Sequence, residues 1–421
     1  MKIKKVLGRE ILDSRGLPTL QCEIYLEDNH CAVSSVPSGL STGKFEALEL
    51  RDKEKKRFFG NGVLMAIENL EKKIAPLLVG RRPDLLLMDK EIIELDGTEN
   101  KSSLGANATL AASIAIARAQ AYVEKKQLFE FLAEFCGYQT KFLDMPTVMF
   151  NILNGGAHAS NDLLIQEFMI MPKVANSFIN YLEMAVRVYR NLKQLLLDEG
   201  LSVSVGDEGG FAPVFKKGKE LPEKVALDFL VKAIDLSGLK NDVVICLDVA
   251  ASQFYDQNLK IYNFANKKFT SSDMVNFYEE LVNQYPIYSI EDGLDEDDWE
   301  GWQIFTKQLS NKVQLVGDDL FVTNVKRIKK GVELGACNAV LIKPNQIGTV
   351  SQTIDAIKLC HEVRYKTVIS HRSGETCDTF IADLVVGAKG GQLKAGAPAR
   401  GERVAKYNRL LEIESLLRSE K

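Results

Sequence analysis

VVICLD, at residues 243–248, is a short apolar run that ends in a carboxylate, and it is the first of six such runs. The other five stand before a charged or titratable residue: YPIYSI before Glu291, KVQLVG before Asp318, NAVLI before Lys343, TVIS before His371 and GQL before Lys394. From Asp248 onward the steps between these polar residues are 43, 27, 25, 28 and 23 residues, which suits one buried parallel strand and one crossover helix per step. Because the carboxyl ends of the strands of a (β/α)8 barrel converge on one mouth, this spacing predicts such a barrel, with six reactive groups in one pocket.

The first third of the chain has a different pattern. Near residue 20, apolar side chains occupy every second position, as in an antiparallel strand with one solvated face: Leu20, Cys22, Ile24 and Leu26. From about residue 62 to residue 135 the pattern becomes helical, and Gly137 then interrupts it. We therefore predict an α/β protein with an N-terminal α+β domain at residues 1–137 and a catalytic barrel at residues 138–421.

Composition argues against several classes of protein. The chain of 421 residues is 46% apolar and 26% charged, as in an ordinary globular protein, and its net charge of −4 provides no basic face for nucleic acid. No apolar run is long enough to span a bilayer, and the opening MKIKKVLGREILDSRG becomes charged before a signal-peptide core can form. The seven cysteines are scattered and form no CxxC pair, which indicates reduced thiols. We expect a cytoplasmic protein without membrane insertion.

Three of the strand-end residues are carboxylates: Asp248, Glu291 and Asp318. Like charges held in one pocket repel one another unless a cation lies between them. Oxygen ligands without a nearby set of cysteines and histidines favour Mg²⁺ over Zn²⁺. The alternative is that each carboxylate separately caps a helix or forms a salt bridge. Because all three carboxylates stand at corresponding strand ends, this is the weaker interpretation.

Two lysines face the same predicted mouth. A lysine crowded by other cations and a metal loses its proton more easily than its reference pKa of about 10.4 indicates, so Lys343 and Lys394 are candidates for a general base. The alternative for each is an ordinary solvated lysine.

An anion-binding group and a candidate acid complete the predicted pocket. His371, Arg372 and Ser373 stand together, and an arginine can bind a phosphate through two hydrogen bonds, which favours a small phosphorylated acid as substrate. The GDEGG stretch carries Asp207 and Glu208 among glycines after a strand-like run, which exposes a carboxylate on a tight turn and suits a general acid there. Taken alone, GDEGG would be read as a simple loop.

These motifs together make the chain resemble the enolase family over nearly its whole length. The motifs that carry the resemblance occur in this order: GREILDSRG, STGKFEALELRD, DGTENK with GANA, NGGAHASN, QEFM, GDEGG, SIEDGLDE, VGDDLFVTN, LIKPNQIG, SHRSGET and ERVAKYN. The resemblance implies a modified barrel that opens ββαα and continues as (βα)6. It also implies the reversible dehydration of 2-phosphoglycerate to phosphoenolpyruvate, with two Mg²⁺ ions in each active site.

The resemblance also assigns roles to single residues. It implies that Asp248, Glu291 and Asp318 bind the tighter Mg²⁺ and that Ser41 helps to bind the second, which joins with the substrate. Lys343 would take the proton from C2, and Glu208 would assist departure of the C3 hydroxyl. The remaining matches are substrate-binding positions: His158, Glu167, His371, Arg372, Ser373 and Lys394.

Partners and competing functions follow from the same resemblance. It implies a homodimer or higher homo-oligomer that binds a small phosphorylated acid. The alternative is a binding role, either as an RNA-processing scaffold or as a surface receptor. This role would be added to the enzyme activity or would replace it. Another proton-abstracting barrel enzyme with a different acid substrate is a third reading. One departure from the family pattern, Leu40 beside Ser41, bears on closure of the loop expected to move.

Overall fold

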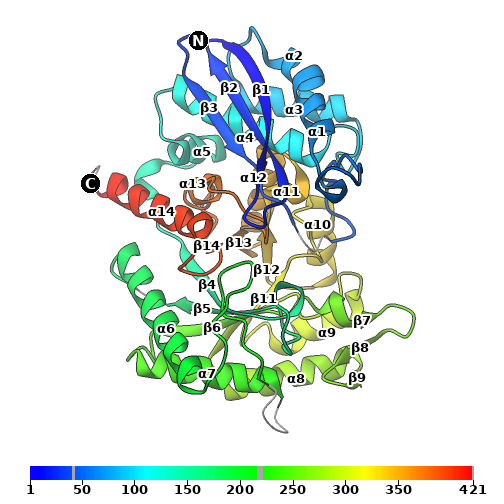
Figure 1. Cartoon of the computed structure of the whole chain (residues 1–421), viewed down its shortest axis with the longest axis vertical. Helices are drawn as coiled ribbons and strands as arrows, with labels where there is room; N and C mark the ends of the chain where they lie inside the picture. The colour runs from blue at the N-terminus through cyan, green and yellow to red at the C-terminus, as the bar shows by residue number, and fades with distance from the viewer. Residues whose placement is uncertain (40–42, 174, 216–220, 420–421) are drawn as a thin grey trace.

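The computed structural model describes residues 1–39, 43–173, 175–215 and 221–419. A small α+β region lies at the top of Figure 1 and a large barrel lies below it. Both regions of the predicted fold are therefore present.

An antiparallel sheet begins the N-terminal region, with its strands side by side in chain order: β1 (Ile3–Leu12), β2 (Pro18–Leu26) and β3 (Cys31–Ser35). The apolar residues that alternate along β2 are fully buried, which confirms the strand pattern. This face packs against α4 (Ala106–Val123), whose many alanines let helix and sheet approach closely. The helical stretches of the region are η1 (Phe58–Gly60), α1 (Leu64–Asn69), η2 (Leu70–Ile74), α2 (Ala75–Leu78), α3 (Leu85–Asp96), α4 and α5 (Leu128–Cys136).

Eight strands close into a barrel in the order β10-β11-β12-β13-β14-β4-β5-β6. Their bounds are β4 (Thr147–Asn154), β5 (Glu167–Pro172), β6 (Val243–Asp248), β10 (Ile287–Glu291), β11 (Gln314–Gly317), β12 (Ala339–Ile342), β13 (Lys366–Ser370) and β14 (Gln392–Lys394). All six apolar runs that predicted the barrel form strands of it. A separate small sheet follows β6: β7 (Tyr255–Asp256), β8 (Ile261–Phe264) and β9 (Lys267–Phe269).

The second barrel strand runs against all its neighbours. β5 pairs antiparallel with both β4 and β6, whereas the other barrel pairs are parallel. Two helices follow it, α6 (Phe178–Asp198) and α7 (Pro222–Leu236). A helix then follows each later strand: α8 (Ser271–Gln284), α9 (Trp299–Leu309), α10 (Val325–Leu334), α12 (Val350–Glu362) after the short α11 (Pro344–Ile347), α13 (Phe380–Gly387) and α14 (Gly401–Ser419). The expected ββαα(βα)6 order is confirmed.

The inside of the barrel is filled below its mouth. A compact apolar cluster is formed by barrel strands, with Met149, Met169, Cys246, Leu341 and Val368 among its members. Beside it, three buried polar side chains bind one another, because the Gln314 amide donates to Ser289 and to Gln392. This packing confines the reactive groups to the mouth.

Hydrogen bonds join the N-terminal helices to the barrel. The Asp89 carboxylate in α3 accepts the backbone N–H of Ser351 at 2.9 Å, and Ser113 in α4 accepts the backbone N–H of Val350 at 2.8 Å. Both donors lie in the first turn of α12, where backbone N–H groups lack helical partners. The domain boundary at residues 137 and 138 stays a prediction.

Candidate active site

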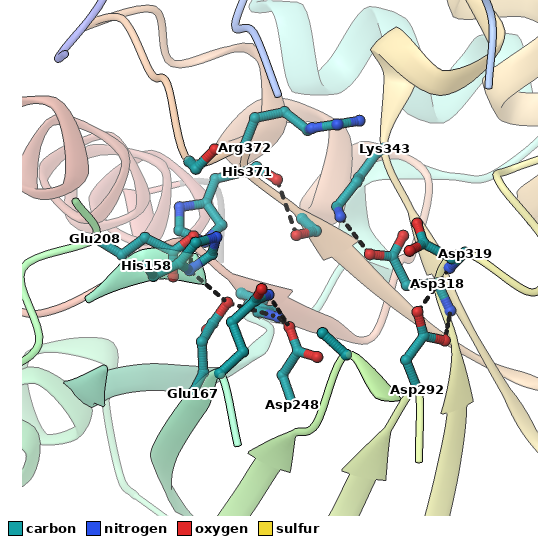
Figure 2. A pocket seen from close by; sticks show the side chains of 15 residues that line it. His158, Glu167, Glu208, Asp248, Asp292, Asp318, Asp319, Lys343, His371 and Arg372 are labelled. Atoms are coloured by element: carbon teal, nitrogen blue, oxygen red, sulfur yellow. Dashed lines mark hydrogen bonds and ion pairs between the residues drawn. The ribbon is translucent and has the colours of Figure 1, made fainter. Parts of the chain in front are cut away.

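One pocket at the mouth of the barrel gathers most of the strand-end groups. Five of the six line it: Asp248, Asp318, Lys343, His371 and Lys394. The sixth, Glu291, ends β10, is buried and accepts hydrogen bonds from Lys394. Figure 2 shows Glu208, His158 and Glu167 on one side of the pocket, with Lys343, Asp318 and Asp319 on the other.

The ammonium group of Lys394 lies among three buried acids. Its Nζ atom is 2.8 Å from Asp248 Oδ2, 3.0 Å from Glu291 Oε1 and 3.2 Å from Glu167 Oε1. Although burial disfavours the ammonium form, these carboxylates outweigh it and raise the pKa of Lys394 well above its usual range. Lys394 therefore stays charged and neutralises part of the acidic pocket.

Lys343 pairs with Asp318 across the ends of two neighbouring strands, β12 and β11. The Lys343 ammonium donates to Asp318 Oδ2, and Gln346 donates to Asp318 Oδ1 at 2.8 Å. Burial disfavours the Lys343 ammonium, but Asp318 outweighs this effect and raises the pKa of Lys343. In this structure the paired carboxylates outweigh the neighbouring cations and raise the pKa of both lysines, and the expectation that Lys343 and Lys394 lose their protons more easily beside a metal stays a prediction.

Glu208 projects into the pocket from the GDEGG turn. The turn closes through a hydrogen bond from the Gly206 N–H to the Gly210 carbonyl, and it presses closely against β4. A Cβ atom at Gly210 would lie 2.7 Å from Asn154 Oδ1, which is closer than packing allows and explains the glycine. Asn151 in β4 then donates its Nδ2–H to Glu208 Oε2 at 2.8 Å and orients the carboxylate.

Two carboxyl groups on this side of the pocket have pKa values shifted in opposite directions. Burial opposes ionisation of Glu208, but neighbouring imidazole, ammonium and guanidinium groups outweigh it and hold the pKa of Glu208 well below its usual range. Burial and repulsion from Glu208 raise the pKa of Glu167 well above its usual range, against the attraction of Lys394. Ligand atoms of Glu167, Glu208 and His158 lie within 4.8 Å of one another. Of the two carboxyl groups, Glu208 therefore favours its ionised form and Glu167 its protonated form.

Two further acids support the lysine side of the pocket. Asp292 follows Glu291 directly, has a φ of 42° and accepts the backbone N–H groups of Asp318 and Asp319, each at 2.8 Å. Sequence reasoning missed Asp292 and Asp319, although both are the second acid of a doublet at a strand end. Burial and the surrounding acids raise the pKa of each well above its usual range.

The anion-binding candidates lie on the loop after β13. The Arg372 guanidinium binds Glu46 Oε2 at 2.7 Å, and the Ser373 hydroxyl accepts from Arg15 at 3.4 Å. Burial opposes ionisation of Arg372, but Glu46 outweighs it and raises the arginine pKa further above its usual range. Both residues also line the pocket, so an anion binding there would meet a permanently charged guanidinium.

The donor set at the mouth fits a hard divalent cation. The three predicted ligands come from adjacent strands, since β6, β10 and β11 hydrogen-bond in that order, and all three are buried. Burial and mutual repulsion raise the pKa of Glu291 well above its usual range, which a nearby cation would relieve. Asp318 also belongs to a group with Asp292 and Asp319 whose ligand atoms lie within 4.8 Å of one another. Oxygen donors in this number suit Mg²⁺. Ser41, the predicted ligand of a second ion, and its neighbour Leu40 lie outside the described residues.

A closed barrel with a reversed second strand, and with carboxylates and lysines gathered at its mouth, has the architecture of a barrel enzyme whose reactive groups lie at one end of its strands. Comparison with family models identifies the particular family. "Enolase, N-terminal domain" matches residues 3–132, and "Enolase, C-terminal TIM barrel domain" matches residues 142–421. The chain therefore belongs to the enolase family.

Membership defines a lyase of the enolase superfamily. Enzymes of this family generally depend on Mg²⁺ and bind small phosphorylated substrates. Among the described residues, none of the helices is both long and apolar enough to cross a membrane.

Proposed function

We propose that the chain catalyses the reversible, Mg²⁺-dependent dehydration of 2-phospho-D-glycerate to phosphoenolpyruvate, a reaction of glycolysis and gluconeogenesis. One observation carries the proposal: Lys343 and Glu208 face each other across a single pocket that Arg372 also lines (Figure 2). A base and an acid on opposite sides of a substrate are what removal of a proton and a hydroxyl from neighbouring carbons requires.

Lys343 takes the proton from C2 of the substrate. Only a neutral amine can accept this proton, so the pairing of Lys343 with Asp318 must loosen before the reaction. On the other side, Glu208 assists departure of the C3 hydroxyl, which leaves as water, and Glu167 lies beside it as a proton reserve. The proton removed at C2 ends on Lys343, and the proton that completes the water comes from the glutamate side.

Substrate binding uses the remaining cations and imidazoles. Arg372 and Ser373 bind the phosphate, so the phosphate competes with Glu46 for the guanidinium. Lys394 contacts the substrate carboxylate, which replaces part of its present contact with the buried acids. His158 and His371, both buried against Glu208, supply polar contacts near the leaving hydroxyl.

Three carboxylates, Asp248, Glu291 and Asp318, would hold the tighter Mg²⁺. When bound, the ion supplies positive charge that stabilises the negative charge gathering on the substrate carboxylate. Ser41 is proposed as a ligand of a second ion. We also keep a homodimer and a cytoplasmic location as predictions.

The test follows the ultraviolet absorbance of phosphoenolpyruvate when purified protein meets 2-phosphoglycerate. We expect a rise with Mg²⁺, no rise with excess chelator, and a loss of roughly a thousandfold or more in kcat for Lys343→Ala. Lys366→Ala is the matched control, because Lys366 is exposed at the opposite end of the neighbouring strand β13.

Two outcomes would contradict the proposal. One is a folded protein with no absorbance rise at any Mg²⁺ concentration. The other is turnover of non-phosphorylated hydroxy acids at a rate equal to that of 2-phosphoglycerate, which would show that the Arg372 side of the pocket does not select a phosphate.

A further inference from the structure

Arg403, in the first turn of α14, is completely buried beside the pocket although it does not line it. Its side chain passes close to Gly396, where a Cβ atom would lie 2.8 Å from Arg403 Cδ. Burying a guanidinium is costly unless its N–H groups find acceptors. We therefore examine which groups accept hydrogen bonds from the Arg403 guanidinium.

Four hydrogen bonds from the two terminal nitrogens of Arg403 join α14 to two segments of the site. Nη2 donates to the carbonyl of Asp207 at 3.1 Å and to that of Ser373 at 2.7 Å. Nη1 donates to the carbonyl of Arg372 at 2.7 Å and contacts the Nδ1 atom of His371 at 2.6 Å. One side chain thus fixes the turn that carries Glu208 and the loop that carries the phosphate-binding candidates.

The contact with His371 determines where the imidazole proton lies. A guanidinium has five N–H donors and no acceptor, so His371 Nδ1 must accept and cannot carry a proton. In a neutral ring the proton is then on Nε2. That nitrogen is buried, lies 3.5 Å from Glu208 Oε1 and has no well-aligned hydrogen-bond partner within the part of the chain that the structure describes.

We propose that Arg403 is a positioning residue that holds His371 as the Nε2–H tautomer, with this N–H directed into the pocket beside Glu208. His371 is then a fixed hydrogen-bond donor rather than a base. The opposite tautomer would place a bare nitrogen against the Glu208 carboxylate, two acceptors facing each other. Burial of the ring supports this assignment, because it lowers the pKa of His371 well below its usual range and keeps the ring neutral.

The tautomer can be measured without any turnover. The chain has four histidines, so nitrogen-15 labelling of histidine gives a spectrum with few signals, and His371→Gln identifies those of His371. Correlation spectra distinguish a protonated ring nitrogen from a bare one. We expect a bare Nδ1 and a protonated Nε2 in the wild-type protein, and a mixture of tautomers in Arg403→Met. A proton on Nδ1 in the wild-type protein would overturn the proposal even if the variant failed to fold.

Kinetics test the consequence for catalysis. This part of the inference rests on the proposed dehydration, whereas the tautomer assignment does not. We expect Arg403→Met to lower kcat by roughly tenfold or more, with a smaller change in KM, as for other enzymes in which a histidine is held as the wrong tautomer. Arg400→Met is the matched control, since Arg400 binds Glu402 and the Ser14 carbonyl but not His371. A wild-type tautomer and an unchanged kcat in Arg403→Met would overturn the proposal. Absence of turnover in the wild-type protein would instead refute the proposed function and leave the spectrum to decide on Arg403.

Discussion

The Nζ atom of Lys394 lies 2.8 Å from the Oδ2 atom of Asp248, inside the mouth of the barrel and away from solvent. This contact has an energetic consequence, because removing one partner of a buried ion pair leaves an uncompensated charge. We expect Lys394→Met to lower the free energy of unfolding by about 3 to 5 kcal/mol in the presence of chelator. Thermal unfolding measures the loss, with Lys366→Met, at an exposed lysine, as the control. Equal losses in the two variants would mean that the acids do not depend on Lys394.

Mg²⁺ should stabilise the folded protein, because the buried carboxylates that we propose as its ligands are brought together only in the native state. At a concentration about 100 times Kd, the expected gain is about 2.7 kcal/mol in the free energy of unfolding. The melting temperature should rise with MgCl₂ but not with NaCl of equal ionic strength, and Asp248→Asn should reduce the rise. A rise that is the same in Asp248→Asn would place the ion elsewhere.

Asp292 should matter for metal binding although it is not among the predicted ligands. Its two carboxylate oxygens accept the N–H groups of Asp318 and Asp319, and an asparagine has only one acceptor oxygen for them. We expect Asp292→Asn to weaken Mg²⁺ binding by roughly ten- to a hundredfold, as for other residues that orient metal ligands. Isothermal titration calorimetry gives the affinity, and Asp235→Asn, at an exposed aspartate, is the control. An affinity within twofold of the wild-type value would exclude an orienting role for Asp292.

Asp89 should make stability depend on pH. Burial, opposed by weaker hydrogen bonds from Ser113 and Ser351, raises the pKa of Asp89 to about 6, whereas an unfolded chain has an aspartate pKa of about 3.9. The folded state therefore binds this proton more tightly, so its contribution to stability is full below about pH 4 and is lost as pH rises through 6. The amount is on the order of 2 to 3 kcal/mol.

Asp89→Asn removes this titration and keeps an acceptor oxygen for Ser351. We expect the melting temperature of the variant, relative to that of the wild-type protein, to rise as the pH is raised from about 4 to about 7.5. Asp235→Asn should show no such trend. A difference between Asp89→Asn and the wild-type protein that does not change with pH would show that Asp89 is ionised in the folded state throughout.

The barrel could be predicted because each of its later units repeats one pattern, a buried run followed by a helix. Asp248 and Lys394, which end their strands, could be placed for the same reason. Glu167 could not, because β5 runs in the reverse direction and its pocket residue precedes the apolar run. The resemblance to a family, rather than the pattern, supplied that residue.

Contacts between side chains were beyond the sequence. The pattern placed Lys343 at the mouth, but it could not indicate that Asp318 would hold the ammonium and raise its pKa. Arg403 lies in the ERVAKYN motif, but nothing in a helical stretch distinguishes an arginine that faces inward from one that faces solvent. Asp292 and Asp319 could have been found from the sequence, because each is the second acid of a doublet at a strand end. In such a doublet one acid can be a metal ligand and the other can orient a ligand.

The hydrogen bonds of Arg403 also bear on how the protein is made. Chains emerge from the ribosome from the N-terminus, and the earlier parts begin to fold while the later parts are still being added. The GDEGG turn, with Asp207, and the loop with Ser373 both precede α14, yet both are held by a residue of that helix. All eight barrel strands precede α14 in the chain, so the two loops gain these hydrogen bonds only when α14 packs against the barrel.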